Sequence, residues 1–230
     1  MPILYVVATP IGNLEDISLR ALRVLREVKL IAAEDTRKTR RLLNAYNIET
    51  PLTSYHEHSK RARLDYLLGY LEKEDLALVS EAGMPGLSDP GYDLIVAAIE
   101  RGISVVSVPG PSAVTTALVV SGLPTDQFVY VGFLPRRKGQ RQRLLSSISD
   151  EARTVVAFEA PHRIREALTD IEEILGDRRI SICRELTKVH EEVFRGRVSQ
   201  AREHFAEPRG EFSLVIEGKT RAWLKFQERS

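Results

Sequence analysis

Three apolar, β-prone stretches in the first half of the chain each run directly into a turn rich in proline and glycine. The stretches cover residues 3–8, 76–80 and 103–108, and the turns that follow them cover residues 9–13, 81–91 and 109–112. In parallel α/β sheets, the carboxyl ends of the strands form the crevice in which ligands bind. Three turns of this kind at such ends therefore predict one ligand site that is assembled from distant segments.

Helix-like segments alternate with these stretches. Residues 18–28 place Ala21, Val24 and Leu25 at helical spacing, and further helices are expected over residues 36–46, 64–71, 92–100 and 113–120. A repeated order of strand, turn, helix and strand is the βαβ unit, whose strands are parallel. Glu34 and Asp35 follow a strand at residues 30–33, and we interpret them as caps of the next helix.

The pattern changes beyond Gly122. Strands are expected over residues 128–133, 154–158, 180–184 and 212–217, with a short one at Val193-Phe194 and a helix over 163–175. Fewer turns here are rich in proline and glycine, so antiparallel pairing is expected as well. The sequence predicts an α/β protein of two lobes with a cleft between them, at residues 1–121 and 122–220, followed by a polar tail at 221–230. The first lobe should hold a mostly parallel sheet and the second a mixed sheet.

Charge and cysteine content exclude several classes of protein. The net charge of +1 over 230 residues gives no whole-molecule attraction to nucleic acid or membrane, so a polyanion would have to bind local basic patches. The single cysteine, Cys183, excludes an intrachain disulfide framework and indicates a reducing compartment. No signal-like or membrane-length apolar segment is evident, so a cytoplasmic protein without a membrane partner is expected. His56 and His58 lack a third ligand at suitable spacing, so we expect no metal site.

The three turns are poorly suited to phosphate. The chain contains no Gly-x-Gly and no P-loop lysine motif. Proline removes a backbone N–H donor at positions 10, 85, 90, 109 and 111. A phosphate nest needs successive N–H donors. The turns therefore favour a ligand with an apolar or aromatic body and a few polar anchors, such as an adenosyl group.

Motifs along nearly the whole chain resemble one family. They are Ala8-Thr9-Pro10-Ile11-Gly12-Asn13-Leu14, Ala33-Glu34-Asp35-Thr36-Arg37, Gly83-Met84-Pro85, Ser88-Asp89-Pro90-Gly91, Pro109-Gly110-Pro111-Ser112-Ala113, Gly132-Phe133-Leu134-Pro135, Pro161-His162-Arg163, Arg184-Glu185-Leu186-Thr187-Lys188 and Gly210-Glu211-Phe212. The chain resembles the tetrapyrrole-methylase-like class of S-adenosylmethionine-dependent methyltransferases. Within that class it is similar to the ribosomal RNA small subunit methyltransferase I family, which methylates a ribose 2′-hydroxyl of a cytidine in small-subunit (16S) ribosomal RNA.

The resemblance implies a homodimer that binds S-adenosyl-L-methionine between two α/β lobes and acts on small-subunit ribosomal RNA or the 30S subunit. Carried over by position, the residues expected to bind the cofactor are Pro10, Ile11, Met84, Leu87, Ser112, Ala113, Ala160, Leu186 and Ser213. A general base would assist, because a ribose hydroxyl is a weak nucleophile. Candidates near the expected cleft are Asp89, Glu81, Glu159 and Lys188, and the sequence does not choose among them.

Basic residues form three clusters, at 37–41, 60–63 and 136–143. Such clusters are usually solvated helix faces. The third follows Pro135 in a stretch expected to be exposed, so Arg136, Arg137, Lys138 and Arg141 are the predicted RNA-binding residues. Two alternatives stay open: an enzyme of the same class that acts on a tetrapyrrole or protein acceptor, and a non-catalytic ribosome-binding module of the same fold.

Overall fold

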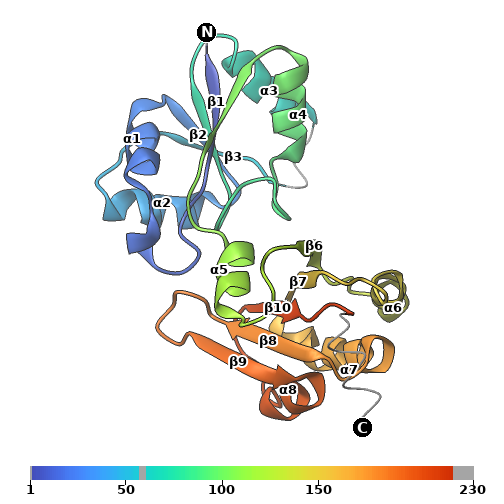
Figure 1. The fold of residues 1–230 in the computed structure, drawn as a ribbon. Helices are drawn as coiled ribbons and strands as arrows, with labels where there is room; N and C mark the ends of the chain where they lie inside the picture. The colour runs from blue at the N-terminus through green and yellow to red at the C-terminus, as the bar shows by residue number, and fades with distance from the viewer. Residues whose placement is uncertain (1, 57–60, 220–230) are drawn as a thin grey trace. The chain divides into compact units, whose positions relative to one another are not determined.

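The computed structural model describes residues 2–56 and 61–219, so the predicted tail at 221–230 lies outside the described residues. The chain forms two compact units, residues 1–112 and 113–230 (Figure 1). Each unit contains one five-stranded sheet. Helix α5 (Ala113–Val120) packs against strands of the second sheet, whereas the sequence-based boundary at residue 121 assigns it to the first lobe.

The first sheet is parallel throughout. Its order is β3-β2-β4-β1-β5, with bounds β1 Ile3–Val7, β2 Leu30–Ala33, β3 Leu52–Ser54, β4 Leu76–Val79 and β5 Ser104–Val108. In register, Val6 of β1 lies opposite Leu78 of β4 and Ser107 of β5. The carboxyl ends of β4, β1 and β5 are therefore neighbours at one edge, as the sequence analysis predicts.

Helices cover both faces of this sheet. They are α1 (Leu19–Glu27), α2 (Thr36–Ala45), α3 (Arg61–Tyr70) and α4 (Tyr92–Glu100). Helices α1 and α2 pack on one face through Leu25 and Leu43, and α3 and α4 pack on the other through Leu68 and Leu94 (Figure 1). Because helices cover both faces, every residue of β2 and β4 is buried. Strands buried in this way have continuous apolar sequences.

Local capping sets where the helices of the first face begin. The Ser18 hydroxyl accepts a hydrogen bond from the Ala21 N–H (3.0 Å) and starts α1. The Asp35 carboxylate accepts bonds from the N–H groups of Arg37 (2.8 Å) and Lys38 (3.2 Å) and starts α2. Asp35 therefore caps the helix as expected. Glu34 does not cap the helix, and its carboxylate accepts a hydrogen bond from the Glu81 N–H instead.

The second sheet is mixed. Its order is β6-β7-β10-β8-β9, with bounds β6 Phe128–Phe133, β7 Thr154–Glu159, β8 Arg179–Arg184, β9 Glu192–Arg197 and β10 Phe212–Ile216. Strand β6 runs parallel to β7, and the other pairs are antiparallel. The mixed sheet predicted for the second lobe is thereby confirmed.

Helices α6 (Lys138–Ser147), α7 (Ile164–Leu175) and α8 (Val198–His204) accompany this sheet. The sequence analysis expects an exposed polar stretch over 136–143, but α6 buries Arg141 together with Leu145. An arginine on the buried face conceals the amphipathic pattern that would have indicated a helix. Across residues 2–56 and 61–219, no helix is long and apolar enough to span a membrane.

Candidate functional site

The three proline- and glycine-rich turns meet in the first unit. Thr9 and Gly83 exchange two backbone hydrogen bonds, each 2.9 Å long, which join the first turn to the second. The Ala8 N–H donates to the Val108 carbonyl (3.1 Å), and a Cβ built on Gly110 would lie 3.0 Å from the Ala8 Cβ. The third turn therefore packs against Ala8, directly before the first turn. Thr9 of the first turn and Ser80 at the end of β4, 71 residues apart, are thus brought together at the carboxyl ends of adjacent strands.

The loop from Gly86 to Gly91 is closed tightly on itself. The Gly86 N–H donates to the Pro90 carbonyl (3.3 Å). Gly91 has a φ of 138°, and a Cβ there would lie 2.9 Å from the Leu78 side chain, so only glycine fits. Between them Ser88 has a φ of 64°, a left-handed conformation that is costly for a serine. Backbone strain of this kind is typical of functional loops.

The residues expected to hold the cofactor give this surface an apolar character. Ile11 is 8% exposed, Pro10 and Met84 are half-buried, and Leu87 is exposed. The N–H groups of Thr9, Gly83 and Gly86 are already bonded within the protein. Together with the prolines, these bonds leave the turns better matched to an apolar nucleoside body than to phosphate. The residues present therefore fit an adenosyl group.

A cluster of carboxylates lies beside the turns. Glu34 follows β2 and Glu81 follows β4, and these two strands are neighbours. The Glu81 N–H donates to the Glu34 carboxylate (3.1 Å), and Lys38 of α2 forms an ion pair with the Glu81 carboxylate. Burial is the main cause that raises the pKa of Glu34 above its usual range. From the sequence alone, both carboxylates of the Glu34-Asp35 pair are interpreted as caps, so Glu34 is not among the expected site residues.

Asp89 belongs to the same cluster and is partly buried. Burial, followed by the negative charge of Glu34, raises the pKa of Asp89 from its ordinary 3.8 to about 7. A hydrogen bond with the Ser80 side chain opposes that shift, and the charge of Glu81 adds to it. In the part of the chain that the structure describes, no lysine, arginine or histidine forms an ion pair with Asp89.

Glu159 stands at the end of β7 in the second unit and is enclosed. It is 1% exposed, and its Oε1 accepts a hydrogen bond from the Ala160 N–H (2.8 Å) and pairs with Arg163 (2.5 Å). Burial raises the pKa of Glu159, while the bond from Ala160 and the charge of Arg163 oppose the shift. Glu159 Oε1 thus holds the Ala160 turn, whereas its Oε2 is buried and has no hydrogen-bond partner among the described residues.

Lys188 lies between two carboxylates. Its Nζ is 3.0 Å from Glu185 Oε1 and 3.0 Å from Glu211 Oε2. Burial opposes the charge, but the bonds to both glutamates outweigh it and raise the pKa of Lys188. The ammonium group is thus protonated at neutral pH and cannot accept a proton there.

The predicted cofactor residues of the second unit share one end of its sheet. Ala160 follows β7, Leu186 follows β8, and Ser213 of β10 lies opposite Phe158 and Cys183. The turn after β8 is strained, since Glu185 and Thr187 have φ angles of 53° and 64°. That turn holds Leu186, which is 7% exposed. Ser112 and Ala113 stand at the start of α5.

The predicted RNA-binding residues do not share one environment. Arg136, Arg137 and Lys138 are exposed at the start of α6. Arg141 is 0% exposed, and its Nε donates to Asp170 Oδ2 (2.7 Å) on α7. Arg141 is therefore a buried structural residue and not an RNA contact, which corrects the prediction. The spacing along the sequence alone does not reveal which face of α6 is covered.

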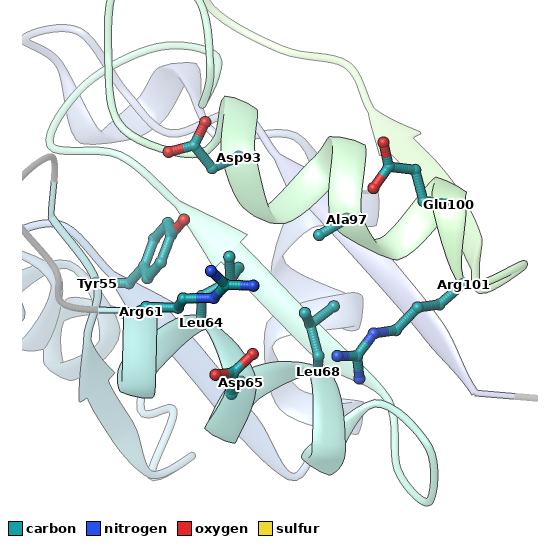
Figure 2. Close-up of a pocket in the computed structure, with 9 residues that line it drawn as sticks. All are labelled: Tyr55, Arg61, Leu64, Asp65, Leu68, Asp93, Ala97, Glu100 and Arg101. Atoms are coloured by element: carbon teal, nitrogen blue, oxygen red, sulfur yellow. The ribbon is translucent and has the colours of Figure 1, made fainter.

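A cavity of about 460 Å³ lies elsewhere in the first unit, between α3 and α4. Tyr55, Arg61 and Asp93 come together at one end of it, and Glu100 and Arg101 lie at the other (Figure 2). None of the predicted site residues lines this cavity. Over the described ranges 2–56 and 61–219, no group of three or more His, Cys, Asp or Glu residues is arranged to hold a metal ion. His58 of the predicted histidine pair lies outside those ranges.

Comparison with known proteins bears on both fold and family. A model of the Tetrapyrrole (Corrin/Porphyrin) Methylases matches residues 3–202. The chain is 52% identical over 219 residues to the ribosomal RNA small subunit methyltransferase I of Thermotoga maritima, covering 94% of this chain and 98% of the relative. The chain belongs to this methyltransferase family. The ribosomal RNA small subunit methyltransferase I of Halalkalibacterium halodurans is also 52% identical to this chain over 219 residues, covering 94% of this chain and 75% of that protein.

More distant solved structures share the fold of this methyltransferase family. Uroporphyrin-III-C-methyltransferase from Thermus thermophilus superposes with a TM-score of 0.67 at 20% identity, covering 94% of both chains. A diphthine synthase superposes with a TM-score of 0.70 at 14% identity, covering 99% of this chain and 94% of that one. At such identities the likeness concerns the fold alone, and it confirms the predicted tetrapyrrole methylase-like fold.

Proposed function

We propose that this protein methylates the ribose 2′-hydroxyl of a cytidine in small-subunit (16S) ribosomal RNA, with S-adenosyl-L-methionine as the methyl donor. The observation that carries the proposal is 52% identity to two ribosomal RNA small subunit methyltransferases I over 94% of this chain, which covers 75% of one relative and 98% of the other. The joined turns of the first unit support it, because their apolar lining suits an adenosyl body.

S-adenosylmethionine supplies a methyl group made electrophilic by its sulfonium. The chain's own residues must bind the donor, align the ribose oxygen and exclude water. In the first unit we propose that Pro10, Ile11, Met84, Leu87 and Ser112 contact the cofactor. In the second unit we propose Ala113, Ala160, Leu186 and Ser213 for the same role. The bonds between Thr9 and Gly83 keep the first two turns in place for this purpose.

For the RNA, we propose that exposed cations at the start of α6 contact phosphates. Arg136, Arg137 and Lys138 are supported by their exposure. Lys138 lies 3.9 Å from Asp170 Oδ1, a separation that leaves its ammonium largely available. Arg141 is excluded by its burial.

The test is methyl incorporation into small ribosomal subunits prepared from a strain that lacks the enzyme. Labelled S-adenosylmethionine and the purified protein are added, and the modified nucleotide is mapped. We expect one methylated cytidine ribose. Label in a base, in a ribosomal protein or in no product would contradict the proposal. Calorimetry with S-adenosylmethionine distinguishes an enzyme from a non-catalytic ribosome-binding module. An enzyme must bind the donor, whereas such a module need not.

We also propose that the protein acts as a homodimer in the cytoplasm. The family resemblance supports the dimer, and the exposed Phe128 and Phe133 on the edge strand β6 are consistent with a partner. The buried free thiol of Cys183 supports a reducing compartment. Light scattering coupled to size-exclusion chromatography should give twice the 25.9 kDa chain mass, and a monomer at working concentrations would contradict the dimer.

A further inference from the structure

The three basic clusters of the sequence differ in how their cations are used. In the second cluster, Arg63 donates to Thr53 Oγ1 (3.1 Å), and its guanidinium carbon lies 5.7 Å from the centre of the Tyr66 ring. In the third cluster, Arg141 is buried against Asp170. The first cluster, at residues 37–41, lies at the start of helix α2 and presents two arginines to solvent.

The charges of the first cluster stand at the end of the helix that favours them least. Helix α2 has four cations among its first six residues, no acidic residue and no cation in its last turn. The amino end of a helix carries a partial positive charge, so cations there are destabilising. Arg37 and Arg41 are also four residues apart, a spacing at which like charges repel each other on a helix. Because both effects oppose folding, these cations indicate a surface that binds an anion.

Two of the four cations are engaged within the first unit itself. Lys38 forms an ion pair with the Glu81 carboxylate. Arg40 is half-buried, and its Nη2 donates to the Thr50 carbonyl (3.4 Å). These two side chains therefore tie α2 to the turn after β4 and to the segment before β3.

Arg37 and Arg41 form the exposed part of the cluster, and we call them the α2 arginine pair. The Arg37 side chain is 89% exposed. It lies 3.5 Å from the Asp35 carboxylate, which already accepts hydrogen bonds from two N–H groups of the helix. Arg41 is exposed and forms no ion pair with the residues that the structure describes. Residues four apart are neighbours on a helix, so the two guanidinium groups share one surface.

The α2 arginine pair stands at the edge of the first sheet that carries the proposed donor turns. Strand β2 leads into α2 through Glu34 and Asp35, so the start of α2 lies at the carboxyl ends of the parallel strands. The Glu81 N–H donates to the Glu34 carboxylate (3.1 Å) and joins this end of β2 to the turn after β4. That turn continues into Met84 and Leu87, which are proposed to contact the donor. The acceptor of the methyl group must approach the same edge.

We propose that Arg37 and Arg41 bind phosphate groups of the ribosomal RNA, so that the first unit contacts the RNA as well as the second. The proposal rests on the proposed function and adds a second contact surface to it. A guanidinium group is planar and binds a phosphate through two parallel hydrogen bonds. An acidic protein surface would match the same charge. RNA is favoured, because the pair lies at the edge that the methyl acceptor must reach.

The experiment compares the double variant Arg37→Gln/Arg41→Gln with a control pair, Lys29→Gln/Lys73→Gln. Lys29 and Lys73 are exposed and precede β2 and β4, so they lie at the opposite edge of the sheet. Each double variant loses two positive charges, so any effect of net charge alone is the same in both. Affinity for protein-free small-subunit RNA and for whole small subunits is measured over a range of salt concentrations. Calorimetry gives donor affinity, and thermal unfolding reports the fold.

For Arg37→Gln/Arg41→Gln we expect weaker RNA binding and a slope of log affinity against log salt that is reduced by roughly 1.4–1.8, because two phosphate contacts are lost. The control pair should keep the wild-type slope, and donor affinity should be unchanged in both variants. The thermal midpoint of the arginine variant should equal or exceed that of the wild type, because its cations no longer oppose the helix dipole.

An unchanged salt slope, or an equal change in the control pair, would overturn the proposal. So would wild-type affinity for protein-free RNA together with weaker binding to whole subunits, since the pair would then bind a ribosomal protein. If the wild-type protein methylates the ribose while the slope of the arginine variant is unchanged, only the α2 arginine pair fails as an RNA contact. If the wild-type protein transfers no methyl group, the proposed function fails and the RNA contact with it.

Discussion

Asp89 weakens the folded state when it is ionised. Burial and the charge of Glu34 raise its pKa from 3.8 to about 7, so the folded chain binds this proton more tightly than the unfolded chain. Ionisation of Asp89 therefore lowers the free energy of unfolding as pH rises between about 4 and 7. Above that window the whole destabilisation is present. A charge retained at such a cost is typical of a functional site.

Replacing Asp89 by asparagine should therefore stabilise the protein at high pH. We expect Asp89→Asn to increase the free energy of unfolding by about 1–2 kcal/mol at pH 8, less than the pKa shift implies, because water reaches part of the carboxyl. The gain should shrink steadily as pH is lowered toward 5. Urea unfolding at both pH values measures it, with Asp93→Asn as the control. A gain that does not depend on pH would contradict the raised pKa.

At the scale of elements, one buried ion pair joins α6 to α7. Arg141 of α6 donates through Nε to Asp170 of α7 (2.7 Å), and Gln142 donates to the other carboxylate oxygen (3.0 Å). Both charged side chains are 1% exposed. Arg141 Nη2 also lies 3.5 Å from Glu166, whose side chain is 74% exposed. The two carboxylates that face Arg141 thus differ mainly in burial.

That difference predicts unequal effects of two similar substitutions. Asp170→Asn should lower the free energy of unfolding by about 3–5 kcal/mol, because it removes the buried counter-charge of Arg141 and leaves only the exposed carboxylate of Glu166. Glu166→Gln should cost about 1 kcal/mol or less, because its ion pair is exposed. Chemical denaturation of both variants provides the comparison. Equal costs would show that Arg141 does not depend on its buried partner.

Some elements could be predicted from the sequence and others could not. The strands of the first sheet are indicated by continuous apolar runs, since helices cover both of its faces. Helix α6 was missed because Arg141 stands where an apolar residue would mark its buried face. Helix α8 is only seven residues long, too short for a clear helical pattern of apolar residues. Of strand β9, the sequence predicts only Val193 and Phe194.

At the scale of the whole molecule, a net charge of +1 makes RNA binding depend on local cations. Arg136 and Arg137 are exposed at the start of α6, whereas Arg141, four or five residues later, is buried. Binding by phosphate contacts releases counterions and weakens as salt increases. The salt dependence of RNA affinity therefore reports how many of these cations take part.

Reversing two of these charges should flatten that dependence. We expect Arg136→Glu combined with Arg137→Glu to weaken RNA binding and to reduce the slope of log affinity against log salt by roughly 1.4–1.8, with donor affinity unchanged. Arg165→Glu on α7, also an exposed arginine of the second unit, is the control. Filter binding over a range of salt concentrations measures the slope. An unchanged slope would exclude these arginines from the RNA contact.

Local sequence patterns are enough to predict the class of fold, the parallel first sheet and the meeting of three turns at one edge. Those features follow from local patterns, because the carboxyl ends of neighbouring parallel strands must lie together. The charge state and accessibility of each candidate residue depend on contacts that form only in the folded chain. Glu34 and Glu81 are 47 residues apart yet hydrogen-bonded, and Arg141 pairs with an aspartate 29 residues away. Burial and pairing depend on such distant partners, which is why the raised pKa of Asp89 cannot be predicted from the sequence.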